Sequence, residues 1–142
     1  MVFGPHLTLD IYGCSREALK DADFIYEILD ELPDLIGMTK ISKPSVSYYD
    51  GNPDSFDKGG VSGFVIIAES HISIHTFVEQ QFASVDIFSC KEFDIEKSVE
   101  YLSGKLGGKK VEKNLIMRGT EFPKDLKVAK PIFEKQRKML KR

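Results

Sequence analysis

A serine, an imidazole and a thiol fall close together near the middle of this 142-residue sequence. Ser70 follows Glu69 in the segment AESHISIHT, His75 comes five residues later, and Cys90 ends the next run of β-forming residues. Near one face of a sheet, these groups can support nucleophilic catalysis. They can equally be turn and packing residues, because serine is common in turns and a lone cysteine often packs as a small hydrophobe. Residue types and spacing leave both interpretations open.

A zinc site is the other chemistry that these residue types permit. His71 and His75 would leave the same side of a strand and, with Cys90 or His6, could bind zinc. However, the histidines follow no usual zinc-ligand spacing, and the sequence has no Cys-x-x-Cys pair. A phosphate-binding glycine loop is also missing. We therefore expect no metal site.

The elements around these residues follow an alternation of strand and helix patterns. We expect strands over 5–12, 35–49 (interrupted near Pro44), 63–68, 72–78, 82–89 and 109–117, and helices over 15–32 (stopped by Pro33) and 95–106. Residues 50–60, rich in Gly, Pro, Asp, Asn and Ser, indicate a loop. The short breaks between the central strands favour antiparallel neighbours. The predicted fold class is α+β, an antiparallel sheet with helices on one face.

The two sides of the predicted strands differ in character. Ile72 and Ile74 share one side of their strand, whereas His71, Ser73 and His75 share the other. The neighbouring strands repeat this contrast, with Asp, Ser and aromatic residues opposite the apolar side. The apolar sides should cover the helices, and the mixed sides suit a second buried layer or a site.

Composition and charge set the broad class of protein. The length fits one domain, and the net charge is −2. Residues 124–142 carry eight basic and two acidic side chains, a net +6, which leaves −8 for residues 1–123. We interpret this basic tail as a solvated helix or chain end rather than a nucleic-acid contact. Two cysteines, no basic leader and no long apolar run indicate a cytoplasmic protein without disulfide or membrane span.

Four segments resemble the short prokaryotic S-adenosylmethionine decarboxylase proenzymes. They are GPHLTLD at 4–10, GVSG at 60–63, AESHISIHT at 68–76 and VDIFSC at 85–90. The resemblance runs in order from about residue 4 to 123 and is most specific in the Glu-Ser-His-x-x-x-His-Thr core. Residues 1–123 are thus identified as a domain of this family, with residues 124–142 as an added tail.

The resemblance implies self-cleavage between Glu69 and Ser70, with Ser70 converted to a pyruvoyl group. That group would form a Schiff base with S-adenosylmethionine and act as the electron sink for its decarboxylation, giving the aminopropyl donor for spermidine synthesis. In the family, the position of Ser62 assists the acyl shift and that of His75 assists the elimination. Cys90 matches the cysteine that returns a proton to the substrate carbon.

The resemblance also implies a substrate-binding set and a dimer. Glu79 falls where the family places a carboxylate on the ribose, Asp10 where it has an acidic residue facing the site, and Phe56 is the candidate for stacking on the adenine, with Tyr49 second. Val78 stands where the family normally has proline, which we interpret as a harmless turn substitution. Short members pair as homodimers in an α/β/β/α sandwich with sites at the interface.

Two other functions remain open at this point. A pyruvoyl-dependent ornithine or arginine decarboxylase would keep Ser70, His75 and Cys90 and change the pocket around Glu79 and Asp10. A non-catalytic homologue would stay uncleaved, as one 16.0 kDa chain.

Overall fold

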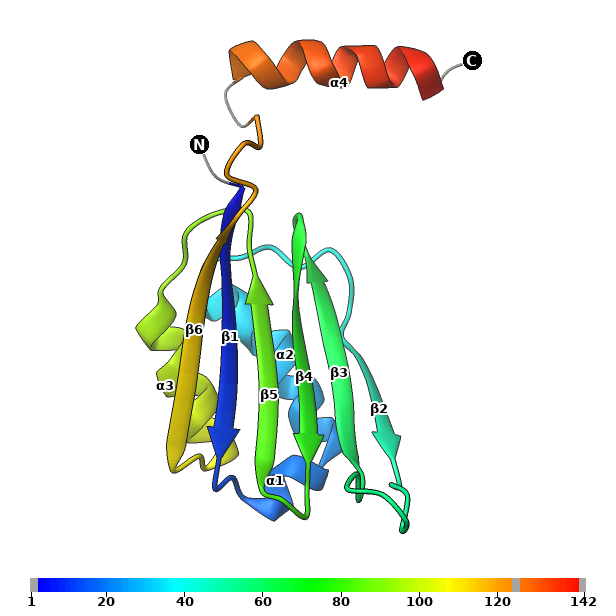
Figure 1. Cartoon of the computed structure of the whole chain (residues 1–142), viewed down its shortest axis with the longest axis vertical. Helices are drawn as coiled ribbons and strands as arrows, with labels where there is room; N and C mark the ends of the chain where they lie inside the picture. The colour runs from blue at the N-terminus through cyan, green and yellow to red at the C-terminus, as the bar shows by residue number, and fades with distance from the viewer. Residues whose placement is uncertain (1–2, 124–125, 141–142) are drawn as a thin grey trace.

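A six-stranded antiparallel sheet with helices on one face forms the body of the protein. The computed structural model describes residues 3–123 and 126–140. The strands are β1 (Gly4–Tyr12), β2 (Ser45–Tyr49), β3 (Gly60–Ile67), β4 (Ser70–Phe77), β5 (Phe82–Phe88) and β6 (Lys110–Arg118), in the spatial order β2-β3-β4-β5-β1-β6. The helices are α1 (Arg16–Lys20), α2 (Ala22–Leu35), α3 (Ile95–Leu106) and α4 (Leu126–Leu140). In Figure 1, α1, α2 and α3 lie behind the sheet. The predicted α+β class is confirmed.

The core lies between the sheet and these three helices. Alternate strand residues, such as Leu7 and Leu9 in β1 and Ile72 and Ile74 in β4, are buried there. They meet the apolar stripe of α2, to which Ile28 belongs. Strand alternation sends the intervening residues to the other face, which no described element covers. The predicted difference between the two sides of the strands is therefore confirmed.

The first predicted helix is two helices, so that expectation is wrong in detail. Asp21 ends α1 and begins α2, and its side chain accepts a hydrogen bond from the Phe24 N–H at 3.1 Å. This N-cap makes a new helix start more favourable than continuation. Pro33 also fails to stop α2, which continues to Leu35. A proline this close to the helix end removes one donor, while the Ile36 N–H still bonds the Leu32 carbonyl.

The strand boundaries differ from expectation by three residues or more at two places. The predicted strand over 35–49 is reduced to β2, preceded by an isolated bridge between Lys40 and Ile67. Strand β3 starts at Gly60, earlier than expected. At this position a Cβ would lie 1.8 Å from the Thr76 carbonyl oxygen. Only glycine permits this close approach of β3 to β4.

The C-terminal tail contains α4, which follows β6 in the chain and lies away from the sheet (Figure 1). Residues 124, 125, 141 and 142 of the predicted tail lie outside the described residues. Within the described part of the chain, no helix combines the length and apolar character needed to cross a bilayer.

Candidate active site

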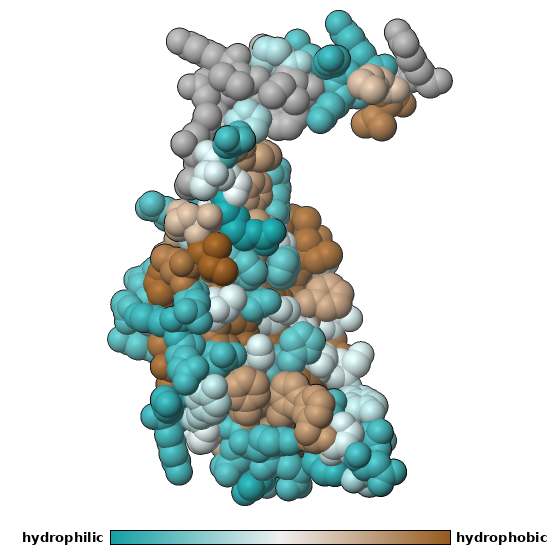
Figure 2. Space-filling view, in the orientation of Figure 1, coloured by the Kyte–Doolittle hydropathy of each residue, from teal (hydrophilic) through white to brown (hydrophobic). Residues whose placement is uncertain are grey.

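The open face of the sheet carries the polar and aromatic side chains in transverse rows. Strand register aligns His71, Phe88 and His6 in one row, and Ser62, His75, Ser84 and Asp10 in another. Figure 2 views this face and shows hydrophilic and hydrophobic residues interleaved across it. Unlike a simple solvated surface, this face presents histidines, serines and phenylalanines together.

Ser70 lies at the end of the sheet where β4 begins. The turn Ala68-Glu69, whose connecting peptide bond is cis, joins β3 to β4 directly before it. The Ser70 side chain is only 9% exposed, and its Oγ has no hydrogen-bond partner among the described residues. Cys90 Sγ lies 3.6 Å from the Ala68 carbonyl oxygen. Ser70 and Cys90 therefore lie against the same turn.

A hollow of about 540 Å³ opens beside Ser70. It is lined by Ile41, Ile66, Ile67, Glu69, Ser70, His71, Phe88 and Arg118. The apolar walls come from Ile41, β3 and β5, and the polar groups come from the turn at Glu69, β4 and β6. This hollow can receive a small molecule against residue 70.

An arginine–histidine–aspartate cluster lies next to this hollow. Arg118 Nη1 lies 3.5 Å from His6 Nδ1, and the Asp86 carboxylate lies 3.9 Å from His6 Nε2. Burial lowers the pKa of His6, and the charges of Arg118 and His71 lower it further, while Asp86 opposes the shift. His6 is therefore held neutral near pH 7, with Nδ1 able to accept from the guanidinium.

Ser62 and His75 form a second polar group, on the open face further along the sheet. They are directly opposite in the β3–β4 register, and Ser62 Oγ lies 2.8 Å from His75 Nδ1. His75 is five residues beyond Ser70, about 17 Å at the usual rise per residue. It also projects from the opposite side of β4. One protomer therefore does not bring the Ser62–His75 pair to Ser70.

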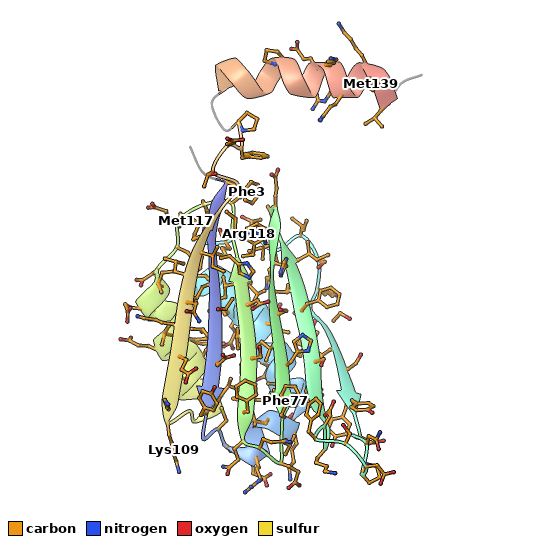
Figure 3. All side chains as sticks on the ribbon, in the orientation of Figure 1. Phe3, Phe77, Lys109, Met117, Arg118 and Met139 are labelled. Carbon is orange, nitrogen blue, oxygen red and sulfur yellow. The ribbon has the colours of Figure 1, made fainter. Side chains whose placement is uncertain are left out.

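Phe56 contributes to an aromatic pocket at the far end of the sheet. The pocket, of about 440 Å³, is lined by Tyr12, Phe56, Phe77, Gln80 and Phe82. The Gln80 amide donates to the Phe56 carbonyl, which fastens the 50–60 loop to the β4–β5 turn, while the Phe56 ring stays 78% exposed. Figure 3 shows Phe77 and Arg118 near opposite ends of the sheet. Tyr49, the second stacking candidate, is exposed on β2 and does not line this pocket.

Glu79 and Asp10 lie toward the same end as the aromatic pocket. Glu79 belongs to the β4–β5 turn, where its carbonyl accepts from Arg16 Nη2 at 3.2 Å. Asp10 is opposite Ser84 and Glu112 in the row that contains His75. Val78, beside Glu79, donates its N–H to the Gly59 carbonyl at 3.2 Å, a bond that a proline there would lack.

Two features of the site were not predicted as such. Arg118 was not considered, and His6 entered only as a possible zinc ligand. No sequence pattern shows that β6 pairs with β1, so nothing brought Arg118 to the Ser70 end before the topology was known. The described residues contain no group of three His, Cys, Asp or Glu side chains arranged to hold a metal ion.

The predicted residues thus divide into two groups toward opposite ends of the sheet. Ser70 and Cys90, with the unpredicted Arg118, form the first group, and it contains the nucleophile and the thiol. Ser62, His75, Asp10, Glu79 and Phe56 form the second, and it contains an imidazole, two carboxylates and the aromatic pocket. The first group can break and form bonds at residue 70, and the second can bind an aromatic, hydroxyl-bearing ligand.

Comparisons with known proteins all give one result. The family model described as S-adenosylmethionine decarboxylase matches residues 5–119. An S-adenosylmethionine decarboxylase proenzyme of Clostridium botulinum (strain Loch Maree) is 38% identical over 82% of this chain and 94% of its own length. One from Symbiobacterium thermophilum is 32% identical over 87% and 89%. The crystal structure of the adenosylmethionine decarboxylase from Aquifex aeolicus VF5 is 31% identical, with a TM-score of 0.66 over 83% of this chain and 92% of that one.

Proposed function

Because the chain belongs to the S-adenosylmethionine decarboxylase family, we propose that it cuts itself between Glu69 and Ser70 and then decarboxylates S-adenosylmethionine. The observation that carries the proposal is the Ser70 hydroxyl, which is buried beside Glu69 and has no hydrogen-bond partner among the described residues. A buried hydroxyl left without a partner is costly in a structural role. The cost is understandable if the hydroxyl has to react.

The bonds that form and break during self-cleavage belong to this turn. Ser70 Oγ attacks the Glu69 carbonyl carbon, the peptide C–N bond breaks, and the amine of residue 70 is released as an ester forms. Loss of the residue-70 Cα proton then expels the Glu69 carboxylate and leaves dehydroalanine. Its imine tautomer takes up water and releases ammonia, so that residue 70 ends as a pyruvoyl group at the start of the second chain. A base is needed for the proton, and an imidazole such as that of His75 suits the task near neutral pH.

The residues around Ser70 fit such a group. Once formed, a pyruvoyl ketone supplies an electron sink for the charge that decarboxylation leaves on the substrate's α-carbon. The hollow at Ser70 offers the ketone apolar walls from Ile41, Ile66 and Ile67. Cys90, which follows β5 and contacts the turn at Ala68, is the candidate to return a proton to that α-carbon.

A homodimer reconciles the two groups of site residues. Ser70 and the Ser62–His75 pair are too far apart, and on opposite sides of β4, to meet within one chain. A second copy laid antiparallel on the open face would bring its Ser62, His75, Glu79 and Phe56 toward this copy's Ser70 and Cys90. The exposed aromatic residues of the open face suit such an interface, and the resulting assembly is the α/β/β/α sandwich. Each site would then take the adenosine part from one copy and the reactive residue from the other.

The product keeps the sulfonium and an aminopropyl arm, the chemistry of an aminopropyl donor for spermidine synthesis. For this role we place the protein in the cytoplasm. No described residue specifically favours ornithine or arginine over S-adenosylmethionine, and the aromatic pocket suits an adenine better than an aliphatic side chain.

Intact-mass measurement of the purified protein tests the proposal. The expected result is two fragments, residues 1–69 and the chain that begins with the former Ser70, which resists Edman degradation and is trapped by borohydride in the presence of substrate. Ser70→Ala should remain one 16.0 kDa chain. CO₂ release is then measured separately with S-adenosylmethionine, ornithine and arginine, and the compound that releases CO₂ is the substrate. Active wild-type protein with an uncut chain would refute the mechanism.

A further inference from the structure

Arg118 presents a cation to the hollow that contains residue 70. It ends β6 and lies opposite Gly4 of β1, on the same face as His6. Arg118, Ser70 and His71 line one hollow, although β6 and β4 are separated in the sheet by β1 and β5. Figure 3 shows Arg118 at the upper end of the sheet, where β4 begins.

Two neutral contacts hold the Arg118 guanidinium in place. Its Cζ lies 4.4 Å from the centre of the Phe88 ring, and its Nη1 lies 3.5 Å from His6 Nδ1. A guanidinium has five N–H donors, so this arrangement leaves most of them available. Within residues 3–123 and 126–140, no carboxylate forms an ion pair with Arg118. Arg118 is therefore a positioned cation that has kept its capacity for an anion.

A carboxylate is the anion that the proposed substrate would bring here. S-adenosylmethionine carries its α-amine and its α-carboxylate on one carbon, and the amine must reach residue 70 for the reaction to start. The carboxylate is then held within a few bonds of residue 70, inside the hollow that Arg118 lines. Planar guanidinium groups match carboxylates with two parallel hydrogen bonds. Resting on the proposed function, we infer that Arg118 is the binding residue for the substrate's α-carboxylate, and that His6 and Phe88 position it.

The kinetic consequence has a definite sign. Arg118 binds the carboxylate while it is charged, but that charge moves into the electron sink as CO₂ leaves. The interaction is therefore weaker in the transition state than in the bound substrate. Loss of Arg118 should raise KM and should not lower kcat in proportion, unlike the loss of a group that acts on the reacting bond.

The test compares Arg118→Gln with wild type on ligands with and without the carboxylate. Arg118→Gln should still cleave itself, as intact mass will show, and its KM for S-adenosylmethionine should rise about 10- to 100-fold, the range of a lost charge-assisted hydrogen bond. Its inhibition constant for decarboxylated S-adenosylmethionine, which has no carboxylate, should stay within about two-fold, well below the loss of one such hydrogen bond. Arg118→Lys should restore part of the affinity, because it keeps the charge and loses the paired geometry. Arg137→Gln on α4, which removes the same charge elsewhere, should match wild type.

Each other outcome overturns the inference. Equal weakening of substrate and decarboxylated product would mean that Arg118 shapes the pocket and does not recognise the carboxylate. Failure of Arg118→Gln to cleave, or release of its 1–69 fragment, would indicate that the guanidinium instead holds the carboxylate of Glu69. An unchanged KM would exclude any binding role. Wild-type protein that neither cleaves nor decarboxylates would instead refute the proposed function, before the variants are compared.

Discussion

At the scale of single residues, the two cysteines have opposite environments. Cys14 is fully buried, its Sγ donates to the Ile11 carbonyl at 3.5 Å, and burial raises the pKa of its thiol to about 11. Cys90 is partly exposed beside the Ala68-Glu69 turn. Because the thiolate is the reactive species, only about one Cys14 in a thousand would be ionised at pH 8. Cys14 is therefore a structural residue, and the site contains only the other thiol.

This difference predicts the course of alkylation. Iodoacetamide at pH 8 should modify Cys90 in the folded protein and inactivate it, while Cys14 reacts only after unfolding. Peptide mass mapping against residual activity measures both rates. The control is Cys90→Ser, which should still cleave itself, lose most decarboxylation and form no rapid adduct. Modification of Cys14 at a comparable rate in the native state would contradict the assignment.

The candidate site residues were predictable to different degrees for a physical reason. Ser70, His75 and Cys90 fall within short contiguous segments, and their types alone raise the possibility of chemistry. Arg118 sits on an edge strand whose partner is far away in sequence, so its neighbours depend on topology. The alternation of side chains along β4 could be predicted from the sequence. The sequence alone did not show that Ser70 and His75 belong to separate groups of site residues, because that depends on the neighbouring strands.

At the scale of elements, Thr76 links three pieces of the fold behind the Ser62–His75 pair. Its buried Oγ1 accepts from the Val61 N–H at 2.7 Å and donates to the Leu19 carbonyl at 2.8 Å. Thr76→Val keeps the shape and leaves both backbone groups buried without a partner. We expect a loss of about 2 kcal/mol in the free energy of unfolding, measured by urea denaturation of the uncleaved Ser70→Ala background.

A second threonine provides the matched control for that measurement. Thr39 is exposed in the segment before β2, so Thr39→Val should change the unfolding free energy by less than about 0.5 kcal/mol. If the two substitutions change the free energy of unfolding equally, the hydrogen bonds of the Thr76 hydroxyl do not stabilise the fold. The same region explains why the start of β3 was predicted too late. Gly60 packs against the Thr76 backbone, a long-range contact that cannot be recognised from the glycine-rich segment around it.

At the scale of the whole molecule, one sheet has a covered face and a face that bears the site. The sheet and its helices could be predicted, because the alternation of apolar and polar residues within each strand indicates which side of that strand is buried. This alternation could not give the strand order, in which β1 is inserted between β5 and β6. That order is what collects Arg118, His6 and Phe88 near Ser70. In the proposed homodimer, the Ser62–His75 pair would complete the site of the other copy.

A split site predicts that two inactive variants can rescue each other. Ser70→Ala lacks the nucleophile and His75→Ala lacks the base, so each should remain uncut when expressed alone. In a mixed dimer, the intact Ser70 of the His75→Ala chain meets the intact His75 of the Ser70→Ala chain. Co-expression in equal amounts should therefore cleave about half of the His75→Ala chains, since random pairing puts half of them in mixed dimers.

The C-terminal fragment carries the His75→Ala mass change, so intact mass identifies which chain was cut. Replacing the Ser70→Ala chain by a Ser70→Ala/His75→Ala double variant should abolish the rescue. If both single variants are uncut alone and stay uncut together in dimers of proven mixed composition, the two residues serve the same chain and the antiparallel pairing of open faces is wrong.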